Sequence, residues 1–277
     1  MALHISEFTQ LGRCTPPVRR LGLATRGNTH LTPDDVLYAI ERGVNYLNWC
    51  AHPDGMSCAI RQLSSEQRQK VVVAMQFFAR NAEAARRELD EKLRELGTDY
   101  VDVVTFYYVE RESEWGEIAG EQGALEPVRE AQTEGGVRLI GLTTHQRSLA
   151  AKRAKHQEVD LLMIRYNAAH RGAEREIFPT TDEVGIPIVA YTCLRWGALL
   201  RPTPEDSPES SPPTAQDCYR FALSHPSVSV AIMAPNDRGE LEANLSLLSD
   251  WRGMTPTEIE QIQAHGARVY RTAGGFP

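Results

Sequence analysis

Polar, aromatic and cationic side chains recur in this sequence at the points where short β-branched runs come to an end. Side chains of these types can exchange protons, hold an anionic group and stack on a planar molecule. Runs that end in this way are typical of barrel strands whose C-terminal ends open into a pocket. The group consists of Trp49, Cys50, His52, Gln76, Tyr107, Tyr108, Glu110, Thr144, His145, Arg165, Asn167, Tyr191, Cys193, Arg195 and Trp196.

Three of these residues are candidates for proton transfer. His145 could act as an acid or a base, since imidazole titrates near neutral pH; the alternative is a loop histidine bonded to a carbonyl. Tyr107 could donate a proton if Arg165 or Arg195 stabilised its phenolate; the alternative is a packed barrel tyrosine. We therefore predict a catalytic group made of Tyr107, His145 and Arg165.

Other members of the group suit substrate binding. Arg165 and Arg195 could clamp a carboxylate or a phosphate with their forked guanidinium groups, or could instead pair with Glu110 or Glu174. The two tryptophans could stack on a planar ligand or pack in the core. No recognised metal-ligand spacing is present, so we expect no metal site. The predicted substrate-binding residues are Trp49, Gln76, Asn167, Arg195 and Trp196.

Eight short apolar runs alternate with longer helical patterns along the chain. Most are nearly continuous in apolar residues, as expected for parallel strands covered by helices. Eight strand-helix units in about 250 residues predict a single (β/α)8 (TIM) barrel over residues 1–277. A doubly wound sheet is the rival, but the chain has no glycine-rich phosphate turn. The runs are 19–25, 44–49, 71–78, 101–108, 137–145, 161–167, 186–193 and 228–234.

The connecting segments carry clear helix signals. In Thr32-Pro-Asp-Asp35, Thr32 can cap a helix and Pro33 suits its first turn. The capping-box sequence Thr255-Pro-Thr-Glu258 predicts an extra helix at about residues 255–267, beyond the eighth unit. The Pro-, Ser- and Glu-rich stretch 202–213 is either a solvated connector or a lid over the barrel mouth.

Composition favours a small-molecule partner. The 277 residues carry a net charge of −7 with dispersed Lys and Arg, which argues against nucleic acid or an anionic membrane surface as the main partner. No apolar stretch approaches the roughly 20 residues needed to span a bilayer. The five cysteines form no CxxC pair and the N-terminus lacks a signal-peptide pattern, so we expect a cytoplasmic chain with reduced thiols.

Several stretches in the same order along the chain resemble the aldo/keto reductase superfamily, in particular a divergent bacterial branch. The resemblance implies a barrel of aldo/keto reductase type that reduces carbonyl compounds with NAD or NADP. The stretches are Arg20-Leu-Gly-Leu-Ala-Thr25, Glu41-Arg-Gly-Val-Asn45, Leu96-Gly-Thr-Asp-Tyr-Val-Asp102, Gly136-Val-Arg-Leu-Ile-Gly-Leu-Thr143, Arg165-Tyr-Asn-Ala-Ala-His-Arg-Gly-Ala-Glu174, Ala190-Tyr-Thr-Cys-Leu-Arg-Trp-Gly197, Cys218-Tyr-Arg-Phe221 and Leu241-Glu-Ala-Asn244.

The residues at the family's catalytic positions differ from the family pattern. The resemblance places the family's aspartate at Asn48, its tyrosine at Pro53 or Asp54, its lysine at Gln76 and its histidine at Tyr107. In the family a tyrosine protonates the carbonyl oxygen, its pKa lowered by a lysine that pairs with the aspartate. An amide in place of that lysine supplies no positive charge. The chain therefore lacks both the usual acid and the lysine–aspartate pair that lowers the pKa of that acid.

The resemblance also locates a cofactor site. It assigns the nicotinamide-stacking aromatic to Tyr191, a polar cofactor position to Thr144 and the closing asparagine to Asn244. The stretch Ala234-Pro-Asn-Asp-Arg-Gly-Glu240, which in the family grips the adenosine phosphate, offers only Arg238 among acidic neighbours. A nucleotide site should therefore favour NAD over NADP, or be weak.

Three functions remain open from the sequence. The first is a divergent oxidoreductase that transfers a nicotinamide hydride to a small carbonyl substrate. This substrate could be anionic. The second is a non-redox acid-base enzyme (a lyase, isomerase or cyclase) in the same pocket, with Tyr107 and His145 exchanging protons. The third is a catalytically silent ligand-binding barrel.

Overall fold

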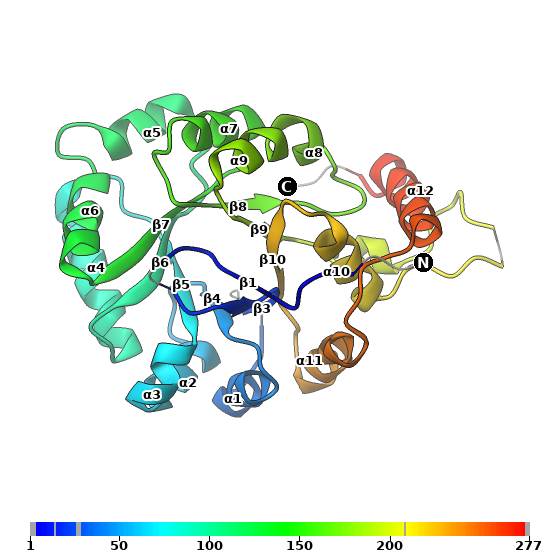
Figure 1. The fold of residues 1–277 in the computed structure, drawn as a ribbon, viewed down its shortest axis with the longest axis horizontal. Helices are drawn as coiled ribbons and strands as arrows, with labels where there is room; N and C mark the ends of the chain where they lie inside the picture. The colour runs from blue at the N-terminus through cyan, green and yellow to red at the C-terminus, as the bar shows by residue number, and fades with distance from the viewer. Residues whose placement is uncertain (1–3, 14, 26–28, 208, 275–277) are drawn as a thin grey trace.

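Eight parallel strands close into a barrel that helices surround on the outside (Figure 1). The coordinates are a computed structural model that describes residues 4–13, 15–25, 29–207 and 209–274. The strands follow one another in chain order around the ring, and β10 pairs with β3 to close it. The predicted (β/α)8 barrel is confirmed. The barrel strands are β3 (Leu21–Ala24), β4 (Tyr46–Trp49), β5 (Val72–Phe77), β6 (Val101–Phe106), β7 (Val137–Thr143), β8 (Leu161–Arg165), β9 (Ile188–Tyr191) and β10 (Val228–Met233).

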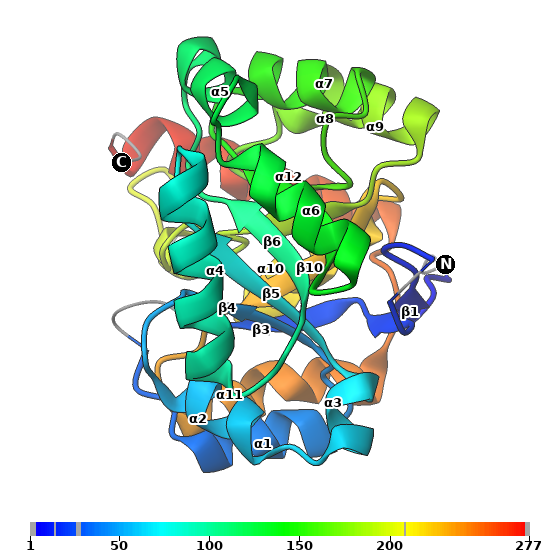
Figure 2. The same ribbon diagram turned by 90° about the vertical axis from the view of Figure 1, so that its left-hand side faces the viewer.

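The helices form the outer layer, and Figure 2 shows α4 and α6 in front of β5 and β6. None of the described helices is long and apolar enough to cross a membrane. The helical segments are α1 (Pro33–Glu41), α2 (Gly55–Gln62), α3 (Ser65–Lys70), α4 (Ala82–Leu96), α5 (Glu112–Ala119), α6 (Leu125–Glu134), α7 (Arg147–Lys155), α8 (Ala173–Glu176), α9 (Phe178–Val184), η1 (Ala198–Leu200), α10 (Ala215–Ser224), α11 (Arg238–Leu245), η2 (Ser246–Asp250) and α12 (Pro256–Thr272).

Local sequence explains where the predicted helices begin. The Thr32 hydroxyl accepts a hydrogen bond from Asp35 N, and the Asp35 carboxylate accepts one from Thr32 N, which makes a capping box at the start of α1. Thr255 and Glu258 form the same box at α12. The extra C-terminal helix is present and runs to Thr272, beyond its predicted end.

A short antiparallel hairpin at the N-terminal end of the barrel was not predicted. It consists of β1 (Phe8–Thr9) and β2 (Val18–Arg19), and Figure 1 shows this dark blue segment crossing the barrel. Leu11 and Val18 pack in the same apolar cluster as the barrel interior. Gly12 approaches so closely that a Cβ there would lie 2.8 Å from Leu139 Cδ2. The hairpin therefore closes the bottom of the barrel and leaves the opposite end for ligands.

A buried ion network joins three strands near this closed end. The carboxylate of Asp102, at the start of β6, is fully buried and accepts hydrogen bonds from Arg68 Nη1 at 2.9 Å and Arg138 Nη1 at 2.6 Å. Asp102 also accepts a bond from Val73 N in β5. Tyr100 lies between the two guanidinium groups, 4.1 Å from that of Arg68 and 4.4 Å from that of Arg138. Because the Asp102 carboxylate is paired with a guanidinium group on each side, the free-energy cost of burying its charge is compensated.

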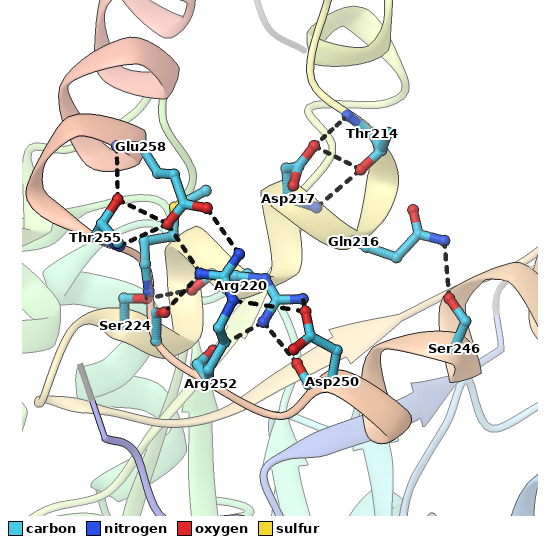
Figure 3. Close-up of polar contacts among 12 residues, drawn as sticks. Thr214, Gln216, Asp217, Arg220, Ser224, Ser246, Asp250, Arg252, Thr255 and Glu258 are labelled. Atoms are coloured by element: carbon cyan, nitrogen blue, oxygen red, sulfur yellow. Dashed lines mark hydrogen bonds and ion pairs between the residues drawn. The ribbon is translucent and has the colours of Figure 1, made fainter. Parts of the chain in front are cut away.

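Ion pairs fix the C-terminal segment against α10 (Figure 3). Arg220 donates hydrogen bonds to the backbone oxygens of Asp250 and Arg252, and its Nη2 lies 3.0 Å from Asp250 Oδ2. Arg252 pairs with Glu258 of α12 at 2.7 Å. These contacts link α10, the segment that follows η2, and the first turn of α12.

The stretch 202–213, described except for residue 208, is tied to α12 through its acidic residues. Asp206 accepts a hydrogen bond from Arg268 Nε at 2.6 Å, and Glu205 pairs with Arg271. The backbone N–H of Thr203, together with Arg268, lowers the pKa of Asp206 to about 2. These contacts run to the C-terminal helix. Arg201, just before the stretch, and Ala215, two residues after it, line the barrel mouth.

Candidate active site

A cavity of about 570 Å³ opens at the C-terminal ends of the barrel strands. This end is where barrels of this kind carry their sites, and the volume suits a small molecule. A broader groove of about 900 Å³ lies on the outer surface beside α2, α3 and α4, away from the strand ends. The inner cavity is lined from the strands by Ala24, Asn48, Gln76, Thr143, Met163, Tyr191 and Ile232, from the loops by Tyr107, Tyr108, Trp196 and Arg201, and from α11 by Glu240 and Asn244, among others.

The floor of the cavity carries no charged residue and combines amide, hydroxyl and apolar side chains. Three residues that line it each have a buried side-chain oxygen with no hydrogen-bond partner within the described part of the chain: Asn48 Oδ1, Thr143 Oγ1 and the Tyr191 hydroxyl. Asn48 is only 1% exposed. Buried polar groups in proteins are normally hydrogen-bonded, so these atoms are suited to bonds with a ligand. The floor therefore fits the neutral hydrogen-bonding groups of a bound molecule.

Two consecutive tyrosines form one wall. The rings of Tyr107 and Tyr108 are stacked, with centroids 4.0 Å apart and planes inclined by 22°. Burial and a side-chain hydrogen bond with Tyr108 raise the pKa of Tyr107. Tyr108 has a left-handed backbone with φ +46°, a conformation that costs a residue with a side chain about 1–3 kcal/mol.

His145 lies behind this wall and is oriented by a carboxylate. Its Nδ1 is 3.1 Å from Glu110 Oε1, and its backbone N–H donates to the same oxygen. The ring packs against Tyr108, with centroids 4.6 Å apart, and more distantly against Tyr191. His145 is not among the residues that line the cavity, so any effect on a bound molecule would pass through Tyr108.

Arg165 stands at the end of β8, next to the cavity wall. Burial lowers its pKa, and the nearby charge of Arg147 acts in the same direction, while Tyr191, Tyr108 and Glu110 oppose the shift. The guanidinium therefore acts electrostatically on Tyr108 and Tyr191. The causes of the Tyr107 pKa shift include no arginine.

Two of the predicted substrate-binding residues hold a strained loop. Asn167 is fully buried, donates to the backbone oxygen of Thr192, and accepts bonds from the N–H groups of residues 169 and 170. Arg195 is 4% exposed and bonds to the backbone oxygens of Val269 and Gly274. Thr192, Arg195 and Trp196 all have positive φ. Neither Asn167 nor Arg195 lines the cavity.

The other predicted residues fall into two groups, those that line the cavity and those that do not. Trp196 lines the cavity with 53% of its surface exposed, and Gln76 lies at the floor. Trp49 is fully buried outside the cavity, and its Nε1 donates to the His52 carbonyl. The Thr144 hydroxyl accepts a bond from Gln146 N and is also outside the lining. The structure thus brings together Gln76, Tyr107, Tyr191, Trp196 and Asn244.

The rim beside α11 is acidic. Glu240 lines the cavity and accepts hydrogen bonds from the backbone and side-chain nitrogens of Asn236. Asp237 caps α11 by accepting from Glu240 N. Arg238, the only cation of this stretch, lies 2.8 Å from Asp35 and over the ring of Tyr38. An additional phosphate at this rim would meet the carboxylates of Asp237 and Glu240, and the nearby guanidinium of Arg238 is already paired through its Nε with Asp35.

The sequence matches the aldo/keto reductase family over residues 28–217, more than half of the chain. The chain belongs to this family. It is 26% identical over 117 residues to the NADH-specific methylglyoxal reductase of Escherichia coli (strain K12), a match that covers 42% of this chain and 35% of that enzyme. It is 23% identical over 227 residues to the uncharacterized oxidoreductase YrpG of Bacillus subtilis (strain 168), covering 70% and 68%. The chain thus matches about a third of the first relative's length.

Solved structures of the family share the fold of this aldo/keto reductase family member. An aldo-keto reductase from Bacillus halodurans in its holo form superposes with a TM-score of 0.73 at 20% identity, over 95% of this chain and 96% of that one. An aldo-keto reductase from Klebsiella pneumoniae in complex with NADPH superposes with a TM-score of 0.74 at 18% identity, over 96% of both chains. At these identities the likeness shows the barrel.

The positions that the resemblance assigns to the family's catalytic residues can be placed in the structure. Asn48, Gln76 and Tyr107 all line the cavity. Asp54 caps α2 by accepting a hydrogen bond from Ser57 N at 2.9 Å. Pro53 carries no ionisable group. The cavity of this family member therefore keeps amides where the resemblance expects an aspartate and a lysine.

A nicotinamide group is compatible with these surroundings. Tyr191 presents an aromatic ring to the cavity, and the unpartnered atoms of Asn48 and Thr143 could bond a carboxamide. Asn244, 4% exposed, lines the same cavity from α11. Among the residues that the structure describes, no group of three or more His, Cys, Asp and Glu could hold a metal ion.

Sequence reasoning placed Tyr108 in the group at the barrel mouth without an individual role, and it gave no role to Glu240. Both tyrosines follow the end of β6 at Phe106, and Tyr108, with a left-handed φ, lines the cavity together with Tyr107. The two adjacent tyrosines at a strand end were the available signal. Nothing in the sequence distinguishes Glu240 from the other acidic residues near it.

Proposed function

We propose that this chain reduces small, uncharged carbonyl compounds with a nicotinamide nucleotide bound at the barrel mouth. The observation that carries the proposal is the single cavity that joins Tyr191 and Asn244, the expected cofactor positions, to the polar floor at Asn48 and Gln76. Relatives in the same family are named as reductases and oxidoreductases. NAD is the better fit because Glu240 and Asp237 make the rim acidic.

The chain's own residues would position and protonate the substrate. When bound, a reduced nicotinamide supplies the hydride that reduces the carbonyl carbon. The amides of Asn48 and Gln76 would orient the substrate oxygen through hydrogen bonds, and a phenol after β6 would give it a proton. Trp196 lines the cavity with an exposed ring that would be available to pack against a bound molecule.

Neutral, hydrogen-bonding compounds suit this floor better than anions. The charged residues among the described cavity lining are Arg201 and Glu240, on the loop and helix side and not on the floor. Arg165 acts on the tyrosines from outside the lining. The anionic substrate that the sequence left open would find a guanidinium, that of Arg201, only on the loop side of the described lining and none at the floor.

One observation favours non-redox acid-base chemistry as a second candidate. Asn48 and Gln76 leave no charged pair to ease phenol ionisation, and burial raises the pKa of Tyr107. A lyase or isomerase would use the same phenols without a nucleotide. Nucleotide binding therefore separates the two candidates.

The first test is calorimetric titration of the purified protein with NADH and with NADPH, followed in parallel by tryptophan fluorescence. We expect micromolar binding of NADH and weaker binding of NADPH. Tyr191→Ala should weaken NADH binding about tenfold, because the loss of one aromatic stack and its burial approaches 1.4 kcal/mol. Tyr270→Ala, an exposed tyrosine of α12, is the matched control. No binding of either nucleotide up to about a millimolar would refute the redox proposal.

A further inference from the structure

Two buried polar side chains lie next to each other on neighbouring strands of the cavity. Thr25 directly follows β3, and its backbone N–H donates to the carbonyl of Asn48 in β4 at 3.0 Å. Both side chains line the cavity, although only 3% of Thr25 and 1% of Asn48 is exposed. Asn48 Oδ1 has no hydrogen-bond partner within the described part of the chain. Asn48 therefore presents an acceptor that the hydrogen of a ligand would satisfy.

The Thr25 hydroxyl is oriented by a chain of hydrogen bonds that leads away from the cavity. Thr25 Oγ1 donates to Cys50 Sγ at 3.7 Å, and Cys50 Sγ donates to Asp54 Oδ2 at 3.6 Å. A carboxylate can only accept, so the thiol donates to Asp54 and its sulfur accepts from Thr25. Met56 Sδ, 4.0 Å from Thr25 Oγ1, is also only an acceptor. The hydroxyl hydrogen thus points to a sulfur in either case, and the Thr25 oxygen is left to accept from a ligand.

The loop that carries Cys50 and Asp54 is held in one conformation. Ala51 has a left-handed backbone with φ +62°, which residues with a side chain rarely adopt, and its carbonyl accepts a hydrogen bond from Lys92 Nζ at 2.7 Å. Asp54 Oδ1 accepts from Ser57 N, which leaves Oδ2 for the thiol. Burial is the main cause that raises the pKa of the Cys50 thiol, so the thiol keeps the hydrogen that it donates. The acidic end of the chain therefore sets its direction.

We infer that Thr25 and Asn48 select carbonyl compounds that carry hydroxyl groups on the carbons next to the carbonyl. Cys50 and Asp54 are positioning residues that keep Thr25 an acceptor. The inference rests on the proposed reduction and names its substrate class. Two acceptors match the hydrogens of two hydroxyl groups, as in a 2,3-dihydroxy aldehyde. A compound without these groups would leave both buried oxygens unpaired, which a polar site penalises more strongly than the loss of an apolar contact.

Two three-carbon aldehydes that differ only in hydroxyl groups, glyceraldehyde and propanal, test the inference with NADH as the nucleotide. In the wild-type protein kcat/KM should be about 10- to 100-fold higher for glyceraldehyde. Thr25→Val keeps the shape of the side chain and removes its oxygen, so it should lower this preference about tenfold, mainly through the KM for glyceraldehyde. Thr25→Ser keeps the hydroxyl and should retain the preference.

Asp54→Asn tests the positioning residues. Asparagine caps a helix as well as aspartate does, so α2 should keep its first turn. Because the amide oxygen is needed by Ser57 N, the amide nitrogen faces Cys50 and donates to its sulfur. The chain then lacks the acceptor that sets its direction, and the preference for glyceraldehyde should fall with the turnover of propanal unchanged. Asp34→Asn, exposed in the first turn of α1, makes the same change in charge and should keep the wild-type preference.

The outcomes separate this inference from the proposed function. No preference in the wild-type protein, or a preference that Thr25→Val leaves intact, would overturn the inference while reduction stands. Weaker NADH binding in Thr25→Val with an unchanged preference would show that the acceptors serve the nucleotide instead. An unchanged preference in Asp54→Asn would remove the positioning role of Cys50 and Asp54. Failure of the wild-type protein to bind NADH or to reduce any aldehyde would instead refute the proposed function.

Discussion

At the scale of single residues, the strand ends and the loop after β6 contribute amides and phenols to the described cavity lining, and no charged group. Asn48 and Gln76 can hold an oxygen by hydrogen bonds but cannot stabilise a phenolate as a lysine does. Burial raises the pKa of Tyr107, which makes this phenol a weaker acid than a free tyrosine.

Glu240 offers a prediction about nucleotide choice. Its carboxylate is bonded to Asn236 at the rim of the cavity, where a 2′-phosphate would meet a like charge. Glu240→Lys should raise NADPH affinity relative to NADH about tenfold, because it replaces repulsion by attraction at short range. Calorimetric dissociation constants for both nucleotides would measure the change.

The matched control for this change is Glu242→Lys. Glu242 is exposed on the same helix and is outside the cavity lining, so the variant makes the same change in net charge. An equal gain in NADPH affinity in both variants would show a general charge effect and would contradict the role of Glu240.

At the scale of elements, the sequence predicted all eight barrel strands and the extra helix, because continuous apolar runs and capping boxes are local signals. The N-terminal hairpin was missed because each of its strands has two residues. The placements of Arg195 and Asn167 could not be predicted either. Both lie at a strand end, but their partners are backbone oxygens brought near only by the fold.

The start of α12 supports a prediction of stability. The side chain of Arg252, with the Thr255 N–H, lowers the pKa of Glu258 to about 2 from its ordinary 4.5 (Figure 3). Glu258→Ala removes the ion pair and half of the capping box, and should cost about 1 kcal/mol of unfolding free energy at neutral pH. Urea denaturation would measure the loss.

The stability difference between wild type and Glu258→Ala should depend on pH in a direction that the lowered pKa of Glu258 sets. A carboxylate whose folded pKa is depressed stabilises the fold above about pH 4.5, and the contribution is lost as the pH falls toward 2. The difference between wild type and Glu258→Ala should therefore shrink at acid pH. Glu260→Ala, an exposed residue of the same helix, should show little change at either pH. A difference independent of pH would mean that the carboxylate charge is not involved.

At the scale of the whole molecule, stability and ligand binding are separated along the barrel axis. The hairpin and the buried carboxylate of Asp102 close the N-terminal end, while the strained residues Ala51, Tyr108 and Thr192 follow strands at the other end. Barrels place their sites at the C-terminal end of the strands and keep the opposite end for stability. Changes at one end should therefore leave the function of the other largely intact.

Asp102 provides the test of this separation. Asp102→Asn would leave the guanidinium groups of Arg68 and Arg138 without their shared charge and should destabilise the fold by about 3–5 kcal/mol, as expected when one member of a buried pair is removed. Under conditions where the variant is still folded, its NADH affinity should equal that of wild type. Asp99→Asn, exposed nearby, controls for the loss of a charge. A stable variant with weakened nucleotide binding would show instead that the two ends are coupled through β5, β6 and β7.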